Sequence, residues 1–112
     1  MKKKLTYCFD IDNTICTTKS TKYSKSIPKE KIIRKINSLY DDGHIIKIYT
    51  ARYMGRNNDQ LNKAKKQGFK STENQLKKWG LKYHNLFFGK PSADLYIDDK
   101  SVFYKKNWIT ML

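Results

Sequence analysis

The sequence predicts an α/β fold built on a parallel sheet, and three observations support this. Short apolar runs alternate with stretches of helical periodicity, which is the pattern of strands joined by crossover helices. Polar residues capable of chemistry follow directly after these apolar runs. The chain has 112 residues, which suits one compact domain over residues 1–112. We therefore expect a three-layer, Rossmann-like parallel sheet with helices on both faces.

The first half of the chain supplies two strands and one helix. Residues 5–9 form a short apolar run that ends at Asp10, which is typical of a buried strand. Residues 17–26 are rich in Thr, Ser and Lys and are expected to form a loop or a small flap. Pro28 can begin a helix, because its fixed φ suits the first helical position. The apolar stripe of this helix comprises Ile32, Ile33, Ile36, Leu39 and Tyr40.

Gly43 ends that helix, and residues 45–49 form a second strand that ends at Thr50. The polar segment that follows contains a weak helix over residues 57–66. A second helical stretch begins later, because Thr72 and Gln75 have the spacing of a capping box.

Two further short strands and a tail complete the chain. Residues 86–88 form the third strand, and residues 93–97 form the fourth, which ends at Asp98 and Asp99. The apolar residues of the tail, 102–108, are expected to cover the sheet.

Charge and cysteine content exclude several classes of protein. Lys and Arg total 24 against 10 Asp and Glu, so the formal net charge is +14. This balance attracts polyanions, but the basic residues are scattered, which favours a solvated basic surface over a nucleic-acid groove. Two cysteines are too few for a disulfide framework, which indicates a reducing, cytoplasmic setting. No apolar run approaches membrane-spanning length, so no membrane partner is expected.

Four segments that are far apart in the sequence converge in this fold. Ligands of open parallel sheets bind at the carboxyl ends of the strands. The residues that follow the four predicted strands are 10–14, 50–52, Lys90 and 98–99. We therefore expect one site at that edge of the sheet.

The residue types at this edge indicate phosphoryl chemistry. Asp10 and Asp12 stand two residues apart, and two close carboxylates repel, which suits one ionised nucleophile beside one protonated acid. A divalent cation would offset the crowding of these two with Asp98, and oxygen ligands favour Mg²⁺. Thr50 supplies a hydroxyl and Lys90 a cation, the pair expected around a phosphoryl group. Attack by a carboxylate on phosphorus gives an aspartyl phosphate.

The same residues resemble a known family. Residues 10–14, Asp-Ile-Asp-Asn-Thr, resemble the first motif of haloacid dehalogenase-like phosphatases, and Thr50, Lys90 and residues 96–99 resemble the second, third and fourth. The motifs occur in family order over nearly the whole chain. Three stretches are similar more narrowly to small capless members encoded among capsular polysaccharide biosynthesis genes and taken to act on sugar phosphates. These stretches are residues 49–52, 88–91 and 96–100.

The resemblance implies a catalytic role for two residues and a binding role for four. Asp10 is the nucleophile. Asp12 protonates the leaving oxygen and then activates the water that hydrolyses the aspartyl phosphate. The phosphoryl group and the substrate are held by Thr50, Ala51, Arg52 and Lys90.

The resemblance also implies a Mg²⁺ site. Its ligands are the side chain of Asp10, the backbone carbonyl of Asp12 and Asp98, while Asp99 acts through a water molecule. Asn13 stands where many relatives have Gly. Because Asn tolerates left-handed backbone better than most residues, the loop can still form.

The lengths between motifs leave no room for a cap domain. Caps in this superfamily enter after the first motif or between the second and third. Residues 15–27 suffice for a flap, and residues 51–89 are needed by the core itself. We therefore expect an open site that a second copy of the chain could cover in a homo-oligomer.

The sequence as a whole predicts a Mg²⁺-dependent phosphatase of small phosphomonoesters. The expected partner is a sugar or polyol phosphate in capsule or surface-polysaccharide biosynthesis. Two alternatives stay open. The net charge of +14 suits a nucleotide or nucleic-acid end as substrate, and a phosphate-binding module without turnover could share the fold.

Overall fold

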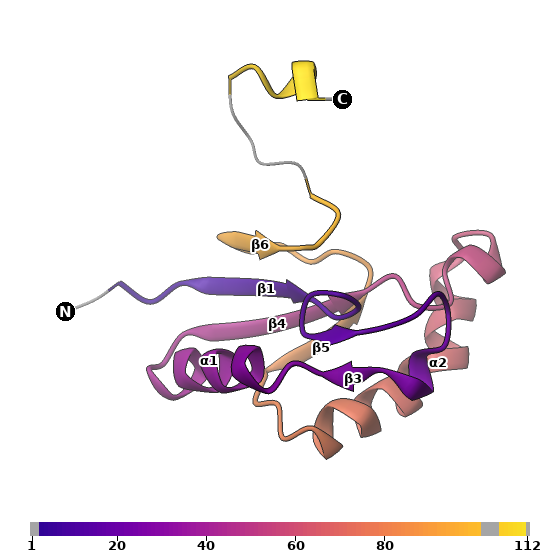
Figure 1. The fold of residues 1–112 in the computed structure, drawn as a ribbon, viewed down its shortest axis with the longest axis horizontal. Helices are drawn as coiled ribbons and strands as arrows, with labels where there is room; N and C mark the ends of the chain where they lie inside the picture. Colours follow the sequence, from indigo (N-terminus) through magenta and orange to yellow (C-terminus); the bar gives the residue numbers. More distant parts are fainter. Residues whose placement is uncertain (1–2, 102–105, 112) are drawn as a thin grey trace.

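A computed structural model describes residues 3–101 and 106–111 and contains a four-stranded parallel sheet (Figure 1). The strand order is β5-β4-β1-β6, and each neighbouring pair is parallel. This confirms the predicted α/β class and the four strands. The strands of the sheet are β1 (Thr6–Asp10), β4 (Ile45–Thr50), β5 (Asn85–Phe88) and β6 (Leu95–Ile97).

Helix α1 (Glu30–Asp41) connects β1 to β4 and begins later than the sequence predicts. Pro28 does not open the helix, because it pairs with Cys16 in a small sheet and Lys29 is the N-cap residue. Ile33 and Ile36 are buried and Leu39 and Tyr40 pack against the core, in agreement with the predicted apolar stripe. Ile32, also assigned to the stripe, is exposed. The chain leaves the helix through Gly43, whose φ of 92° favours glycine.

Helix α2 (Leu61–Lys78) is one continuous helix, and here the prediction of two helical stretches is wrong. Asn58 and Asp59 have left-handed backbone, with φ of 52° and 59°, so the helix begins after them. Thr72 does not cap a helix, because it is buried in the middle of α2. Its hydroxyl group has a tertiary partner, which a local capping pattern cannot reveal.

Both helices pack on the same face of the sheet. Residues in register on parallel strands project to the same face, and Phe9, Ile48 and Leu86 are in register. Phe9 and Ile48 belong to the core cluster that also contains Ile36 of α1 and Leu76 of α2, and Leu86 packs against it. The second helical layer that the sequence predicts is therefore not present among the described residues.

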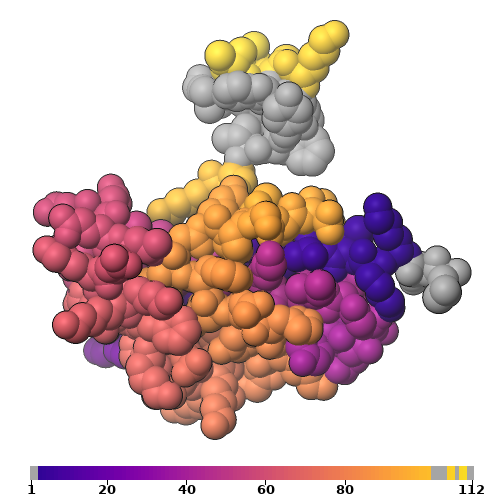
Figure 2. Space-filling view, turned by 180° about the vertical axis from the view of Figure 1, so that it is seen from behind, coloured from indigo at the N-terminus to yellow at the C-terminus, as the bar shows by residue number. Residues whose placement is uncertain are grey.

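The opposite face carries Cys8, Lys47, Tyr49 and Phe87, and Tyr96 on that face is 39% exposed. In the view from behind, the segment that carries β5 and β6 lies at the surface (Figure 2). The tail expected to cover this face lies partly outside the described residues.

A short flap follows β1, as the sequence predicts. It is formed by β2 (Cys16–Thr17) and β3 (Ile27–Pro28), which pair antiparallel, with the 3-10 helix η1 (Tyr23–Lys25) between them. No cap domain occurs within residues 3–101. Two further 3-10 helices are η2 (Gly55–Asn57) and η3 (Trp108–Met111).

Both cysteines are fully buried and neither forms a disulfide. The Cys16 thiol lies within hydrogen-bond distance of the Ile11 carbonyl and the Thr18 hydroxyl. Cys8 is a small side chain packed in the interior, and this burial raises the pKa of its thiol to about 11. Among the described helices, none combines the length and apolarity that crossing a bilayer would need.

Candidate active site

The carboxyl ends of the central strands bring three carboxylates together. Asp10 is the last residue of β1, and Asp98 and Asp99 follow β6, which pairs directly with β1. Asp10, Asp98 and Asp99 each offer an oxygen, and these oxygens lie within 4.8 Å of one another. Two of the segments that the sequence placed at this edge therefore meet there.

The electrostatics of this cluster differ from one carboxyl group to the next. Burial raises the pKa of Asp10 from 3.8 to about 7, and the negative charge of Asp98 and a hydrogen bond with Asp99 add to this. Burial by itself would also raise the pKa of Asp98. Hydrogen bonds from Tyr49 and from the backbone N–H of Lys100 outweigh it, so the pKa of Asp98 is lowered. The cluster is thus crowded with negative charge that a cation would offset.

The loop after β1 turns sharply to present Asp12 beside Asp10. The carbonyl of Ile11 accepts hydrogen bonds from the backbone N–H groups of Thr14 and Ile15, at 3.1 and 2.9 Å. Asn13 occupies the left-handed region with a φ of 62°, as its tolerance for that conformation predicts. Its Oδ1 accepts the backbone N–H of Thr18 at 3.1 Å, which ties the loop to the flap.

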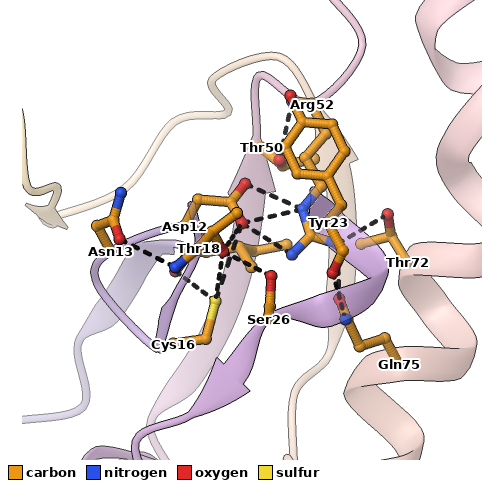
Figure 3. Close-up of polar contacts among 11 residues, drawn as sticks. Asp12, Asn13, Cys16, Thr18, Tyr23, Ser26, Thr50, Arg52, Thr72 and Gln75 are labelled. Carbon is orange, nitrogen blue, oxygen red and sulfur yellow. Dashed lines mark hydrogen bonds and ion pairs between the residues drawn. The ribbon is translucent and has the colours of Figure 1, made fainter. Parts of the chain in front are cut away.

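Asp12 forms a two-point ion pair with Arg52 (Figure 3). Nη2 of Arg52 donates to Oδ1 of Asp12 at 2.8 Å, and Nε donates to Oδ2 at 2.9 Å. Thr18 Oγ1 donates to Oδ1 at 2.6 Å as well. The side chain of Arg52 is only 2% exposed, whereas that of Asp12 is 21% exposed, so the pair lies at the boundary between the interior and the site. Charge-assisted bonds of this two-point kind fix the orientation of a carboxylate.

Helix α2 and the flap hold Arg52 in turn. Nη1 of Arg52 donates to Gln75 Oε1 at 2.6 Å and more weakly to Thr72 Oγ1 at 3.5 Å. The guanidinium carbon lies 4.9 Å from the ring centroid of Tyr23 in the flap. Nε2 of Gln75 donates to the backbone carbonyl of Tyr23 at 2.7 Å. Arg52 therefore connects the loop after β1, the flap and α2.

A hollow of about 220 Å³ opens at this edge of the sheet. Seven of the predicted site residues line it: Asp10, Asp12, Asn13, Ala51, Arg52, Asp98 and Asp99. Four residues whose roles were not predicted complete the lining: Ser20, Tyr23, Tyr49 and Lys100.

Thr50 and Lys90 lie at the same edge but do not line the hollow. Thr50 is buried, and its hydroxyl oxygen accepts the backbone N–H of Arg52 at 3.0 Å. The Lys90 ammonium lies 4.3 Å from the ring centroid of Tyr96, although its charge contributes to the lowered pKa of Asp98. Contact between these two residues and a phosphoryl group stays a prediction.

Several residues of this site escape reasoning from sequence. Tyr49 lies inside a strand, yet its hydroxyl donates to Asp98 across the neighbouring strand. The sequence pattern predicts a capping box for Gln75, but its side-chain oxygen accepts a hydrogen bond from Arg52. The sequence signal for Tyr49 is the alternation of side chains along a strand. Tyr49 pairs with Asp10 in the strand register, so the two side chains project from the same face of the sheet. Gln75 carries no comparable signal.

The described carboxylates fit a hard divalent cation. The set of Asp10, Asp98 and Asp99 offers only oxygen donors, which Mg²⁺ prefers. The carboxylate of Asp12 is not part of this set, and Arg52 and Thr18 bind it instead.

Comparison with known proteins supports the fold. The chain matches no protein-family model and no curated protein. It is similar to the crystal structure of a target protein from Vibrio cholerae, with 25% identity, a TM-score of 0.72 and coverage of 87% of this chain and 81% of that chain. It is also similar to a conserved protein from Bacteroides thetaiotaomicron, with 18% identity, a TM-score of 0.64 and coverage of 97% and 87%. Neither structure is described with an activity, so the likeness concerns architecture.

Proposed function

We propose that this protein is a Mg²⁺-dependent phosphatase that hydrolyses phosphomonoesters through an aspartyl phosphate on Asp10. The observation that carries the proposal is the cluster of Asp10, Asp98 and Asp99, whose oxygens lie within 4.8 Å of one another at the carboxyl edge of the sheet. The four sequence motifs, in the order found in haloacid dehalogenase-like phosphatases, support the same chemistry.

Asp10 and Asp98 would hold the metal ion directly, with Asp99 beside them. When bound, Mg²⁺ would neutralise carboxylate charge and polarise the phosphoryl group. Tyr49 and the backbone N–H of Lys100 keep Asp98 ionised and oriented through their hydrogen bonds.

In the first step, a carboxylate oxygen of Asp10 forms a bond to phosphorus while the bond from phosphorus to the leaving oxygen breaks. Asp12, which we propose carries a proton when the substrate is bound, gives that proton to the leaving oxygen. Oδ1 of Asp12 accepts hydrogen bonds from Arg52 Nη2 and Thr18 Oγ1, whereas Oδ2 accepts from Arg52 Nε. Oδ2 thus keeps more capacity for a proton and is the atom we assign to proton transfer.

In the second step, water attacks the phosphorus of the aspartyl phosphate. Asp12 accepts the proton of that water, the bond between phosphorus and the Asp10 oxygen breaks, and inorganic phosphate leaves. Atoms balance over the two steps, and both carboxyl groups return to their starting states. The two-point contact from Arg52 keeps Asp12 in one orientation through both proton transfers.

The cations near the hollow suit a phosphoryl substrate. Lys100 lines the hollow, and Lys90 lies near enough to act on Asp98. Arg52 orients Asp12 through its own bonds, so we assign it a positioning role in place of the predicted substrate contact. The substrate we propose is a sugar or polyol phosphate, in keeping with the resemblance to capless members from capsule gene clusters.

The test is a phosphate-release assay over sugar phosphates, nucleotides, phosphoserine and acetyl phosphate, with Mg²⁺ and with EDTA. Wild type should release phosphate only with the metal, and Asp10→Asn should lose at least about 1000-fold in kcat because it lacks the nucleophile. Asp59→Asn is the matched control, since Asp59 is exposed and does not line the hollow. Circular dichroism checks that each variant is folded.

Two outcomes would contradict the proposal. Turnover retained by purified Asp10→Asn would exclude Asp10 as the nucleophile. Absence of phosphate release from every compound would instead favour a binding module without turnover.

A further inference from the structure

A second cavity of about 340 Å³ lies between the flap and helix α2. The flap contributes Tyr23 and Ser24 to its lining, and α2 contributes Asn74 and Lys78. Its volume falls in the range of roughly 300 to 1,000 Å³ that small-molecule sites occupy. The phosphatase chemistry described above does not use it.

This cavity adjoins the hollow that contains Asp10. Tyr23 and Arg52 line both, so the two spaces share a wall. The wall is held firmly, since Arg52 is bound on one side to Asp12 and on the other to Gln75. A substrate whose phosphoryl group is at Asp10 would reach the second cavity by extending past Tyr23 and Arg52.

The lining of the cavity has a definite chemistry. It contains hydroxyl and amide side chains, aromatic rings and two cationic side chains, but no carboxylate. Asn74 and Lys78 are exposed to solvent, and the amide of Asn74 offers both a donor and an acceptor. Tyr53 and Trp79 supply apolar ring surface. Such a mixture suits a neutral or anionic group that carries several hydroxyls, and it disfavours a cationic one.

We propose that this cavity is the subsite for a hydroxyl-bearing leaving group of the substrate, with Asn74 and Lys78 as its contacts. The proposal rests on the proposed phosphatase function and adds the place where the substrate is recognised. The flap side of this cavity is held by the hydrogen bond from Gln75 Nε2 to the Tyr23 carbonyl.

Helix α2 provides a matched pair of double variants. Asn74 and Lys78 line the cavity, whereas Asn62 and Lys66 have the same residue types and spacing on the same helix and line neither space. All four side chains are exposed, so neither N74A/K78A nor N62A/K66A should unfold the protein. Each variant is assayed with hexose phosphates and glycerol 3-phosphate, and with acetyl phosphate, whose leaving group has no hydroxyl for the cavity.

We expect N74A/K78A to lower kcat/KM for the best hexose or glycerol phosphate by at least about tenfold. Its kcat/KM for acetyl phosphate should stay unchanged, and N62A/K66A should match wild type with both. An equal loss on both substrates, or no loss on either, would overturn the subsite.

A binding experiment tests the proposed subsite even if the protein has no phosphatase activity. The side-chain amide of Asn74 should shift in an NMR titration with the same sugar phosphates in EDTA, and that of Asn62 should not. If wild type releases no phosphate even from acetyl phosphate, the proposed function fails, yet this titration still decides the subsite. The subsite proposal would be overturned if no sugar or polyol phosphate shifted the Asn74 signal. It would also be overturned if AMP were the one ligand that shifted it.

Discussion

Arg52 decides the geometry of the candidate site at the scale of single residues. Its guanidinium binds Asp12 at two points, Gln75 at 2.6 Å and Thr72 at 3.5 Å, and it lies against Tyr23. A side chain with so many internal partners has little capacity to bind substrate. Its contribution is to fix the second carboxylate of the site.

We expect Arg52→Gln to destabilise the protein by about 3 kcal/mol, because it leaves the partly buried carboxylate of Asp12 without its ionic partner. Adding Asp12→Asn should recover part of that loss, since it removes the unpaired charge. Urea denaturation of the two single variants and the double variant measures the coupling energy. Strictly additive losses would mean that the pair is not coupled.

Asp10 should make the stability of the metal-free protein depend on pH. Its folded pKa of about 7 lies above the ordinary 3.8, so its contribution to stability is present below 3.8 and is lost as the pH rises through about 7. Asp10→Asn carries no charge at any pH and avoids this loss. In EDTA at about pH 8 we expect it to raise Tm by at least about 4 °C, the shift that roughly 1 kcal/mol produces in a domain of this size.

The matched measurements are made at about pH 4, where folded Asp10 is uncharged and its burial no longer opposes folding, so Asp10→Asn and wild type should have similar Tm values. Asp59→Asn should not raise Tm at either pH. A Tm of Asp10→Asn below that of wild type at about pH 8 would show that the negative charge of Asp10 does not destabilise the metal-free protein.

At the scale of elements, α2 is shaped by what packs against it. Gly68 is buried in the middle of this helix, where Ala would ordinarily stabilise by about 1 kcal/mol. A Cβ at Gly68 would lie 2.1 Å from Cε2 of Tyr53. Tyr53 has little room to move, because its ring lies 5.0 Å from Tyr23 and 4.8 Å from the guanidinium of Arg56.

We therefore expect Gly68→Ala to destabilise the protein by about 1 to 3 kcal/mol, the usual cost of overpacking. Gly55→Ala is the control and should change little, because a Cβ there meets nothing within 4 Å. Urea denaturation compares the two. A more stable Gly68→Ala protein would mean that the ring of Tyr53 moves freely.

The flap is likewise fixed by tertiary contacts and not by its own short strands. β2 and β3 comprise two residues each. Ser26 and Thr18 share a hydrogen bond of 2.6 Å between their hydroxyl oxygens, and Thr18 also donates to Asp12. The position of the flap therefore depends on its contacts with Asp12 at the candidate active site.

At the scale of the whole molecule, the dominant feature is the net charge of +14. Like charges on a compact protein repel one another, and salt screens that repulsion over a Debye length of about 10 Å at 0.1 M. The Arg52–Asp12 pair is largely shielded from solvent and should be affected much less.

Raising NaCl from about 0.05 to 0.5 M should therefore increase Tm, because screening of the repulsion outweighs the loss of exposed ion pairs. Differential scanning fluorimetry measures this. A variant in which Lys63, Lys66 and Lys70 of α2 are replaced by Gln should show a smaller increase. A Tm that falls with salt would contradict the expectation.

The sequence alone predicted much of this molecule. Its apolar runs located the four strands, and its helical stripe located α1, because strands and amphipathic helices follow from local periodicity. The parallel topology then placed Asp10 beside Asp98, since strand ends of such a sheet meet at one edge. The positive φ of Asn13 was also predictable, because it depends on the backbone preference of one residue.

Only the tertiary structure decided how the side chains are partnered. The pairing of Asp12 with Arg52, the place of Lys90 over Tyr96 and the role of Gln75 join residues that no local pattern relates. The two helical stretches expected from the sequence form one helix, α2, in the structure. Among the described residues, both helices pack on one face of the sheet and none covers the other. Local periodicity fixes which face of an element is buried, whereas contacts between side chains depend on packing across the whole fold.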